Sequence, residues 1–404
     1  MVVILFVIAF SLNVSTYKYE RIAAQYSGEA DSVLYQYINA IDKIRMSGSE
    51  ERTAFRFLVP SATIEQNNIK KNRPIVIISV IFESATYIFN IVLYYLIIKK
   101  NMNLSTGSFI AFTSAFGTFT STAIELMGKI DDFYSIKVMF GRLEPLFNSV
   151  PENSGDKESV TEVSGNITVE NVSFSYGEGD KLVLNDLSIN IPQGEYLAIV
   201  GASGCGKSTL LKLLLGFEKP TAGRICYDSR DLESLDKKSV RRKLGVVLQN
   251  GSLISGSIYD NITITANHPT RQEVNQVIED VGLKDDIDAM PMGIHTVLSE
   301  SGSTISGGQQ QRILIARAII GRPKVLYFDE ATSALDNITQ AKVCESLDKL
   351  NMTRIVIAHR LSTIKNCSRI IVLKDGRIAE EGNYDSLMAK RGLFYDMAIR
   401  QIAE

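Results

Sequence analysis

The sequence predicts a chain in two parts: an N-terminal α-helical region that crosses a membrane, and a C-terminal α/β domain with a mostly parallel sheet. The long apolar runs fall within residues 1–130, whereas the remainder is a polar, globular mixture. Beyond residue 168, apolar strands alternate with helices, which is typical of a parallel sheet wrapped by helices. The net charge of −2 over 404 residues gives no indication of a nucleic-acid partner.

A glycine-rich loop between an expected strand, residues 196–200, and an expected helix, residues 210–215, carries the clearest chemical signal. Its glycines let backbone N–H groups close around phosphate oxygens, and its lysine neutralises phosphate charge. A glycine-rich turn without a ligand fits the same pattern, so the loop alone does not decide the function. The nucleotide-binding candidates are Gly201, Ser203, Gly204, Cys205, Gly206, Lys207, Ser208 and Thr209.

Two downstream segments supply groups that a triphosphate site requires. Residues 325–330 are an apolar run ending in Asp329 and Glu330, where a magnesium ligand and a water-polarising base would lie. Residues 305–309 offer a hydroxyl, two glycine amides and an amide side chain at the start of an expected helix, suited to a second phosphate contact. Taken alone, the latter segment is an ordinary helix cap. Its candidate residues are Ser306, Gly307, Gly308 and Gln309.

In this order and spacing, the motifs resemble the ATP-binding cassette family over residues 168–404. The resemblance implies a P-loop NTPase fold with a helical subdomain over about residues 252–322, and ATP and Mg²⁺ as cofactors. It also implies that residues 306–309 are the signature motif, which acts on the ATP held by a second cassette. Hydrolysis would therefore require a dimer.

The resemblance assigns nucleotide and metal contacts to individual residues. Tyr176 would stack on adenine, and Lys207 would hold the outer phosphates. Ser208, Gln249 and Asp329 would hold magnesium, directly or through water. Two of these residues have simpler interpretations, because Tyr176 also fits an aromatic on an edge strand and Gln249 a solvated turn residue.

Three further residues receive catalytic or communicating roles from the same resemblance. Glu330 would activate the attacking water, and His359 would contact the γ-phosphate. Asp336 ends the loop 333–336 that communicates across the dimer. A histidine at the end of a strand can also be a purely structural residue, so His359 has that alternative.

The N-terminal region is expected to contain two spans. Residues 74–98 are almost wholly apolar and long enough to cross a hydrocarbon core about 30 Å thick. Residues 107–128 form a weaker candidate, rich in Ser and Thr, that also fits a buried core helix. Glu83 and Asn90 share a face of the first span, so we expect that face to line the translocation route, with ordinary interhelical hydrogen bonding as the alternative.

The segments flanking these spans complete the domain plan. Residues 2–14 do not fit a secretory signal, and we interpret them as the end of a helix whose beginning this chain lacks or another chain supplies. Residues 17–66 are polar with an apolar stripe, and the family has a cytoplasmic coupling loop there. The expected domains are a partial transmembrane domain (1–147), a linker (148–167) and the cassette (168–404).

Spans fused ahead of a cassette resemble exporters. Residues 290–296 and 353–359 resemble bacterial export permease-ATPases of the bacteriocin (NHLM) type. The expected function is ATP-driven export of a peptide across the bacterial inner membrane by a multi-pass protein with a cytoplasmic cassette. The expected partners are membrane lipid and a second half-transporter, identical or different. The alternatives are a multidrug or lipid exporter, a truncated fragment that does not transport, and a soluble chromosome-maintenance ATPase.

Overall fold

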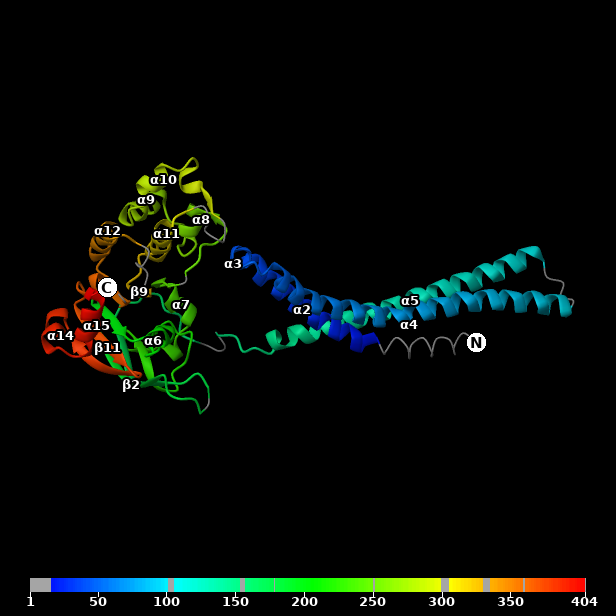
Figure 1. Ribbon diagram of the computed structural model, residues 1–404, viewed down its shortest axis with the longest axis horizontal. Coiled ribbons are helices and arrows are strands. Elements are labelled where there is room, and N and C mark those ends of the chain that lie inside the picture. The colour runs from blue at the N-terminus through cyan, green and yellow to red at the C-terminus, as the bar shows by residue number, and fades with distance from the viewer. Residues whose placement is uncertain are drawn as a thin grey trace. The chain divides into compact units, whose positions relative to one another are not determined.

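The structure is a computed structural model that describes residues 16–100, 105–152, 157–177, 179–249, 251–298, 305–329, 335–358 and 360–403. The chain divides into two compact units, Met1–Val150 and Pro151–Glu404 (Figure 1). The first unit is helical and the second is an α/β domain. The predicted fold class, a helical region followed by an α/β cassette, is therefore confirmed.

The first unit consists of long helices that run alongside one another (Figure 1). Helix α2 leads through the short α3 into α4, and α5 returns along α4. Gly48 ends α3 in the left-handed conformation (φ 58°), and Ser105 caps α5 by accepting a hydrogen bond from Ser108 N. Residues 17–66, where a cytoplasmic coupling loop is expected, are helical for nearly their whole length. The helices are α2 (Thr16–Asn39), α3 (Ile41–Ser47), α4 (Glu50–Lys99) and α5 (Thr106–Phe147).

The predicted first span is the second half of α4. Within the described residues, α4 is the one helix long and apolar enough to cross a membrane, with a mean hydropathy of 2.0 over its most apolar window. At 50 residues it is about 75 Å long, so more than half of it extends beyond a hydrocarbon core. The second predicted span falls within α5, which does not reach the same threshold, and it remains a prediction.

Two layers of contacts hold α4, α5 and α2 together. In the apolar layer, the ring of Phe89 on α4 stacks on Phe116 of α5 with centroids 3.9 Å apart. In the polar layer, the Glu20 carboxylate on α2 accepts a contact from Lys71 Nζ on α4 at 2.6 Å and from Ser135 Oγ on α5 at 3.1 Å. Since Lys71 precedes the apolar run by three residues, the polar layer lies directly at its end.

The second unit contains two main sheets. One is antiparallel, with strand order β2-β1-β4-β5, and the other has the order β12-β11-β3-β10-β9-β6. Strands β11, β3, β10, β9 and β6 pair in parallel, and β12 is antiparallel to β11. Four apolar runs, at residues 196–200, 244–248, 325–328 and 354–357, predict strands of the parallel sheet, and they are confirmed as β3, β6, β9 and β10. The strands are β1 (Ile167–Phe174), β2 (Leu184–Ile191), β3 (Tyr196–Gly201), β4 (Ala222–Tyr227), β5 (Arg230–Asp231), β6 (Leu244–Val247), β9 (Val325–Asp329), β10 (Thr353–Ile357), β11 (Arg369–Lys374) and β12 (Arg377–Gly382).

Helices cover these sheets and form a separate subdomain. Helices α8 to α11, with the short β7–β8 hairpin, make up the helical subdomain predicted between the second and third parallel strands (Figure 1). The helices are α6 (Lys207–Leu214), α7 (Lys237–Arg241), α8 (Ile258–Thr263), α9 (Arg271–Asp280), α10 (Lys284–Asp288), α11 (Gly307–Ile319), α12 (Asn337–Asp348), α13 (Leu361–Ile364), α14 (Tyr384–Lys390) and α15 (Leu393–Ala403), with single 3₁₀ turns η1 (Leu232–Ser234) and η2 (Gly293–His295) and the hairpin strands β7 (Gly256–Ser257) and β8 (Val297–Leu298).

Part of the predicted linker belongs to the core of the second unit. Val160 and Val163 are only 3% and 4% exposed and belong to the core between the two sheets. Val160 N donates to Ser239 Oγ at 2.8 Å, and Ser164 N donates to Asp228 Oδ2 at 2.7 Å. The packed chain of this unit therefore begins before residue 168.

A buried pair of phenols joins the two sheets. Tyr227 Oη at the end of β4 donates to the carbonyl of Leu214 on α6 at 2.8 Å, and it lies 2.5 Å from Tyr327 Oη on β9. Burial raises the pKa of both phenols, so both keep their protons at neutral pH. Because Tyr227 uses its proton on Leu214, Tyr327 must be the donor to Tyr227.

The direction of these bonds predicts unequal effects for two matched substitutions. Tyr227→Phe leaves both the Leu214 carbonyl and the Tyr327 hydroxyl without partners, and should cost about 2–4 kcal/mol. Tyr327→Phe removes one donor and leaves Tyr227 bonded, and should cost about 1 kcal/mol. Calorimetric unfolding of the detergent-solubilised chain measures the difference in stability between the two variants. Calorimetry is chosen because the chain has no tryptophan for fluorescence. Equal shifts in Tm would contradict the assigned donor order.

Candidate nucleotide-binding site

The glycine-rich loop leaves the carboxyl end of β3 and enters α6. Strand β3 lies between β11 and β10, and its residues from Leu197 to Val200 are at most 1% exposed. The continuous apolar run of β3 is explained by this central position, since a parallel strand is covered on both faces. The loop is thus carried on a central strand that is buried on both faces.

Two glycines in the loop occupy positions that a side chain would not fit. Gly201 has φ +155°, and a Cβ there would lie 2.4 Å from the Leu373 carbonyl oxygen. Gly206 has φ +108°, and a Cβ there would lie 2.7 Å from Leu184 Cδ2. The backbone is therefore closely packed from behind and turns in a way that favours glycine.

Lys207 is buried inside this loop. Its side chain ends among backbone oxygens, with Nζ donating to Gly201 O at 2.7 Å and to Ala202 O at 3.0 Å, and the residue is 7% exposed. A buried ammonium requires polar partners, and here the loop carbonyls supply them. The rim of the loop is exposed at Ser203, Gly204 and Ser208, whereas Cys205 and Thr209 are buried. The loop thus presents amides and hydroxyls around a fixed positive charge, which is the arrangement a phosphate requires.

The carboxyl ends of neighbouring strands bring further predicted residues to the same edge of the sheet. Asp329 ends β9 and is 9% exposed, and it pairs in register with Ile357 of β10. Ile357 in turn pairs with Ile199 of β3. Val247 of β6 pairs with Phe328, so Gln249, two residues beyond β6, follows from the same edge.

The residues at this edge suit a magnesium ion. Mg²⁺ prefers oxygen ligands and is usually held by one or two carboxylates together with substrate phosphates. Ser208, Gln249 and Asp329 supply a hydroxyl, an amide and a carboxylate from α6, β6 and β9. Within the described ranges no group of three His, Cys, Asp or Glu residues could hold a metal by itself. The donor set therefore fits an ion that takes its remaining ligands from phosphate and water.

Three parts of the predicted site lie outside the described residues. They are Glu330, His359 and the segment 333–334 of the communicating loop. Asp336, which ends that loop, is described and caps α12 by accepting from Ile338 N at 3.1 Å and Thr339 N at 3.0 Å. These bonds to the Thr339 and Ile338 amides lower the pKa of the Asp336 carboxyl.

Tyr176 lies just beyond β1, close to the loop. Its hydroxyl is 3.2 Å from Thr209 Oγ1 on α6, and Lys212 Nζ lies 5.5 Å from its ring centroid. Its ring also contacts Phe174 edge-on with centroids 5.0 Å apart, yet the residue is 56% exposed. The alternative of an edge-strand aromatic accounts for the Phe174 contact only. The large exposed ring beside the phosphate loop suits base stacking, which remains a prediction.

The signature candidate begins α11 in the helical subdomain. Ser306 and Gln309 form a reciprocal capping box, with Ser306 N donating to Gln309 Oε1 at 2.9 Å and Gln309 N donating to Ser306 Oγ at 3.2 Å. Gly307 and Gly308 form the first turn of α11, so their amides point out of its N-terminal end. The helix-cap interpretation is thus correct for this structure and compatible with an anion contact. Among the described residues, no hydrogen bond or ion pair joins residues 306–309 to the loop 201–209.

Sequence reasoning missed the residue that orients this cap. Asp286 on α10 accepts from Gln309 Nε2 at 2.7 Å and pairs with Arg312 on α11 at 2.8 Å. It lies in a run of three aspartates among four residues, and nothing in that run distinguishes it from its solvated neighbours. Only the packing of α10 against α11 reveals it.

Comparison with known proteins decides the family of this unit. Residues 184–333 match the family model described as ABC transporter. The chain contains the ATP-binding domain of an ABC transporter. The matched range runs from β2 to the loop after β9, and so includes the phosphate loop, the signature segment and Asp329.

Relatives of this ATP-binding domain occur in exporters. The toxin RTX-III translocation ATP-binding protein of Actinobacillus pleuropneumoniae is 35% identical over 407 residues, which cover 96% of this chain and 56% of the relative. The leukotoxin export ATP-binding protein LtxB of Aggregatibacter actinomycetemcomitans is 40% identical over 295 residues, 72% of this chain and 42% of the relative. The chain thus spans about half the length of the curated relatives it matches.

A solved structure matches the whole chain, helical region included. It is a bacterial Atm1-family ABC exporter with ATP bound, with a TM-score of 0.87 and 26% sequence identity. The match covers 100% of this chain and 71% of that chain. The helical first unit is therefore similar to part of an exporter as well.

The packing behind Gly206 predicts the effect of adding one methyl group to the loop. Gly206→Ala places Cβ against Leu184 in a left-handed backbone conformation, and should lower ATP affinity roughly tenfold. Gly321→Ala is the matched control, because nothing lies within 4 Å of its Cβ position. Titration of the full chain with a fluorescent ATP analogue measures both variants. Unchanged affinity in Gly206→Ala would show that the loop does not hold the phosphates.

Proposed function

We propose that this chain hydrolyses ATP to drive export across the bacterial inner membrane, with its ATP-binding domain in the cytoplasm. The observation that carries this proposal is the buried Lys207 ammonium in a glycine loop at the edge where β6, β9 and β10 also end. A phosphate bound by this loop would lie beside the acidic end of β9. The helical unit, with α4 as a span, supports coupling of this site to a membrane.

We infer that two ATP-binding domains cooperate in hydrolysis. The phosphate loop and the signature segment belong to different elements of the unit and share no hydrogen bond in the described residues. A second domain, facing the first, would supply its residues 306–309 to the ATP held by the phosphate loop. The partner is a half-transporter that is either identical or different. ATP then joins the two surfaces, and its hydrolysis separates them.

Individual residues take the following roles in this proposal. Lys207 and the loop amides hold the outer phosphates, and Tyr176 stacks on the base. Ser208, Gln249 and Asp329 would hold Mg²⁺, which neutralises charge on the phosphates when it is bound. Residues Glu330 and His359 act on the attacking water and on the γ-phosphate, respectively.

The names of the relatives support a polypeptide cargo. They are named for the translocation or export of toxins, among them alpha-hemolysin in Escherichia coli. We infer that the exported substrate is a polypeptide, and a bacteriocin-type peptide is the narrower form of this proposal.

One polar group on the span supports a route between helices. Asn90 Oδ1 on α4 is buried and has no hydrogen-bond partner among the described residues, whereas Glu83, seven residues earlier, is exposed on the described surface. A buried amide oxygen in a membrane helix requires a partner from a neighbouring helix, from water or from cargo. The buried Asn90 oxygen supports the proposal that the face with Glu83 and Asn90 is directed toward such a partner.

Glu330→Gln tests the hydrolytic step. The amide cannot accept the proton of the attacking water, so turnover should fall roughly 100-fold or more while ATP remains bound. Glu345→Gln is the matched control, since Glu345 is exposed on α12 and pairs with Lys349 at the surface. The measurements are phosphate release, and dimer formation with ATP by light scattering in detergent. Brisk turnover in Glu330→Gln would exclude this residue as the base.

A further inference from the structure

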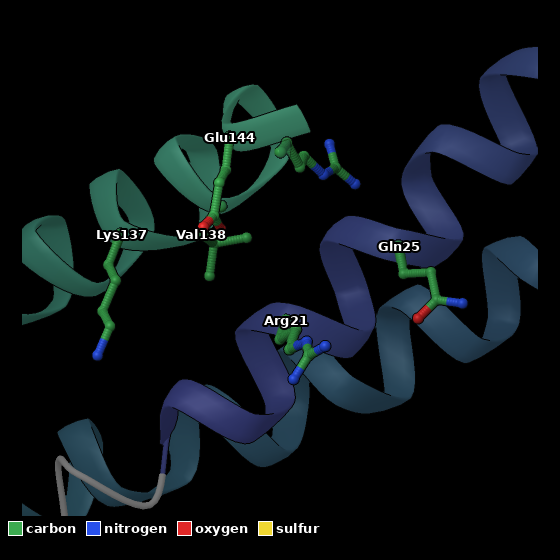
Figure 2. Close-up of a pocket in the computed structure, with 7 residues that line it drawn as sticks. Arg21, Gln25, Lys137, Val138 and Glu144 are labelled. Atoms are coloured by element: carbon green, nitrogen blue, oxygen red, sulfur yellow. The ribbon is translucent and has the colours of Figure 1, made fainter. Parts of the chain in front are cut away.

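A cleft in the helical unit lies between α2 and α5. Its volume is about 550 Å³. Figure 2 shows that its lining comes from two helices, with Arg21 and Gln25 on α2 and Lys137, Val138 and Glu144 on α5. Gly141 and Arg142 of α5 complete the lining.

The cleft carries an excess of positive charge. Three cations, Arg21, Lys137 and Arg142, and one carboxylate, Glu144, line the cleft. Arg142 Nη2 donates to the carbonyl of Ala24, which ties this guanidinium across to α2. The Arg21 guanidinium is exposed, and in the described part of the chain it has neither a hydrogen-bond acceptor nor an ion-pair partner. A guanidinium in a concave basic site is suited to bidentate binding of a phosphate.

Contacts between the helices give the position of the cleft relative to the apolar run. Glu20 contacts Lys71 and Ser135, so α2, α4 and α5 meet at one level. Lys71 lies three residues before the apolar run, which begins at Pro74. Arg21 is the next residue after Glu20, and Lys137 lies two residues, about 3 Å, beyond Ser135. Arg142 lies about 10 Å beyond Ser135. The headgroup layer is about 5–8 Å thick on each side of the hydrocarbon core.

Arg21 and Lys137 therefore lie where lipid phosphates would be, if α4 crosses a membrane as proposed, whereas Arg142 lies further from the apolar run. Lys70, Lys71 and Arg73 on α4 add to the positive charge at this level. This end of the span leads to the polar parts of α2 and α4, so it is the cytoplasmic end in the proposed orientation. Basic pockets between helices on that side favour anionic headgroups.

We propose that the cleft between α2 and α5 binds the phosphate of an anionic phospholipid headgroup in the cytoplasmic leaflet. Arg21 and Lys137 contact the phosphate, and Arg142 holds the two helices together beneath it. A lipid bound there would bridge α2 and α5, and so would stabilise one packing of the helical unit. This inference rests on the proposed membrane location but not on ATP hydrolysis or on the cargo.

The test uses the full chain in nanodiscs of neutral phosphatidylcholine with one part in ten of spin-labelled phosphatidylglycerol. We expect the labelled lipid to be enriched beside the protein, and Arg21→Gln/Lys137→Gln to reduce that enrichment about tenfold. The matched control is Lys43→Gln/Arg52→Gln, which removes one lysine and one arginine exposed on α3 and α4 far from the apolar run. The control should retain the enrichment of the unchanged chain.

A second arm distinguishes lipid from a soluble anion. Inorganic phosphate at millimolar concentration should not displace the labelled lipid, because the bilayer holds the headgroup at a high local concentration. Displacement would assign the cleft to a soluble phosphate and overturn the proposal. Equal enrichment in the double variant, in its control and in the unchanged chain would also overturn it.

ATP hydrolysis measured in the same nanodiscs separates this inference from the proposed function. Normal hydrolysis without lipid enrichment would reject the headgroup site alone. Enrichment that depends on Arg21 and Lys137, in a chain that does not hydrolyse ATP, would reject the hydrolytic function alone. A chain that fails to enter the nanodiscs would reject the membrane location, and with it both proposals.

Discussion

Four strands of one parallel sheet, β6, β9, β10 and β3, end at the same edge, and the proposed chemistry depends on this constraint. Val247 pairs with Phe328, and Ile357 pairs with Asp329, the residue after Phe328. The residues that follow β6, β9 and β10 therefore leave the sheet side by side. The phosphate loop then needs only to leave β3 at that edge. A shift of one residue in the pairing of β9 would turn Asp329 to the other face of the sheet, because side chains alternate along a strand.

The support behind this edge comes from polar groups that are fully satisfied inside the core. Tyr327 precedes Asp329 by two residues on β9, and its hydroxyl bonds to Tyr227 on β4, which bonds to the carbonyl of Leu214 on α6. One chain of hydrogen bonds thus connects the acidic strand, the second sheet and the helix that begins at the phosphate loop. Because each phenol is buried and neutral, the connection carries no buried charge and holds over the physiological pH range.

The sequence predicted best what depends on local patterns. Apolar runs predicted β3, β6, β9 and β10 to within about one residue, because a buried parallel strand is a continuous apolar segment. The sequence predicted poorly the ends of elements that extend beyond their apolar run. Helix α4 begins at Glu50, far ahead of its apolar run, and passes through Pro60 and Pro74, since tertiary packing against α2 outweighs the local cost of proline. The contacts of Asp286 with Gln309 and of Val160 with Ser239 join residues distant in sequence, and no periodicity encodes them.

In the proposed function, the helical unit supplies a stiff connection between the membrane and the cytoplasm. Helices α4 and α5 continue through the level of Glu20, Lys71 and Ser135 without interruption, so a rotation at one end must appear at the other. The Glu20 contacts join α2 to both helices at the end of the apolar run, where the surroundings would change from hydrocarbon to water if α4 crosses a membrane as proposed. An ion pair there is partly shielded, at 17% and 20% side-chain exposure, and so is screened less than one at a free surface. If α2 moves relative to α5, the Glu20 contacts with Lys71 and Ser135 must either break or move together with the helices. A headgroup that bridges Arg21 and Lys137 would favour movement with these contacts intact.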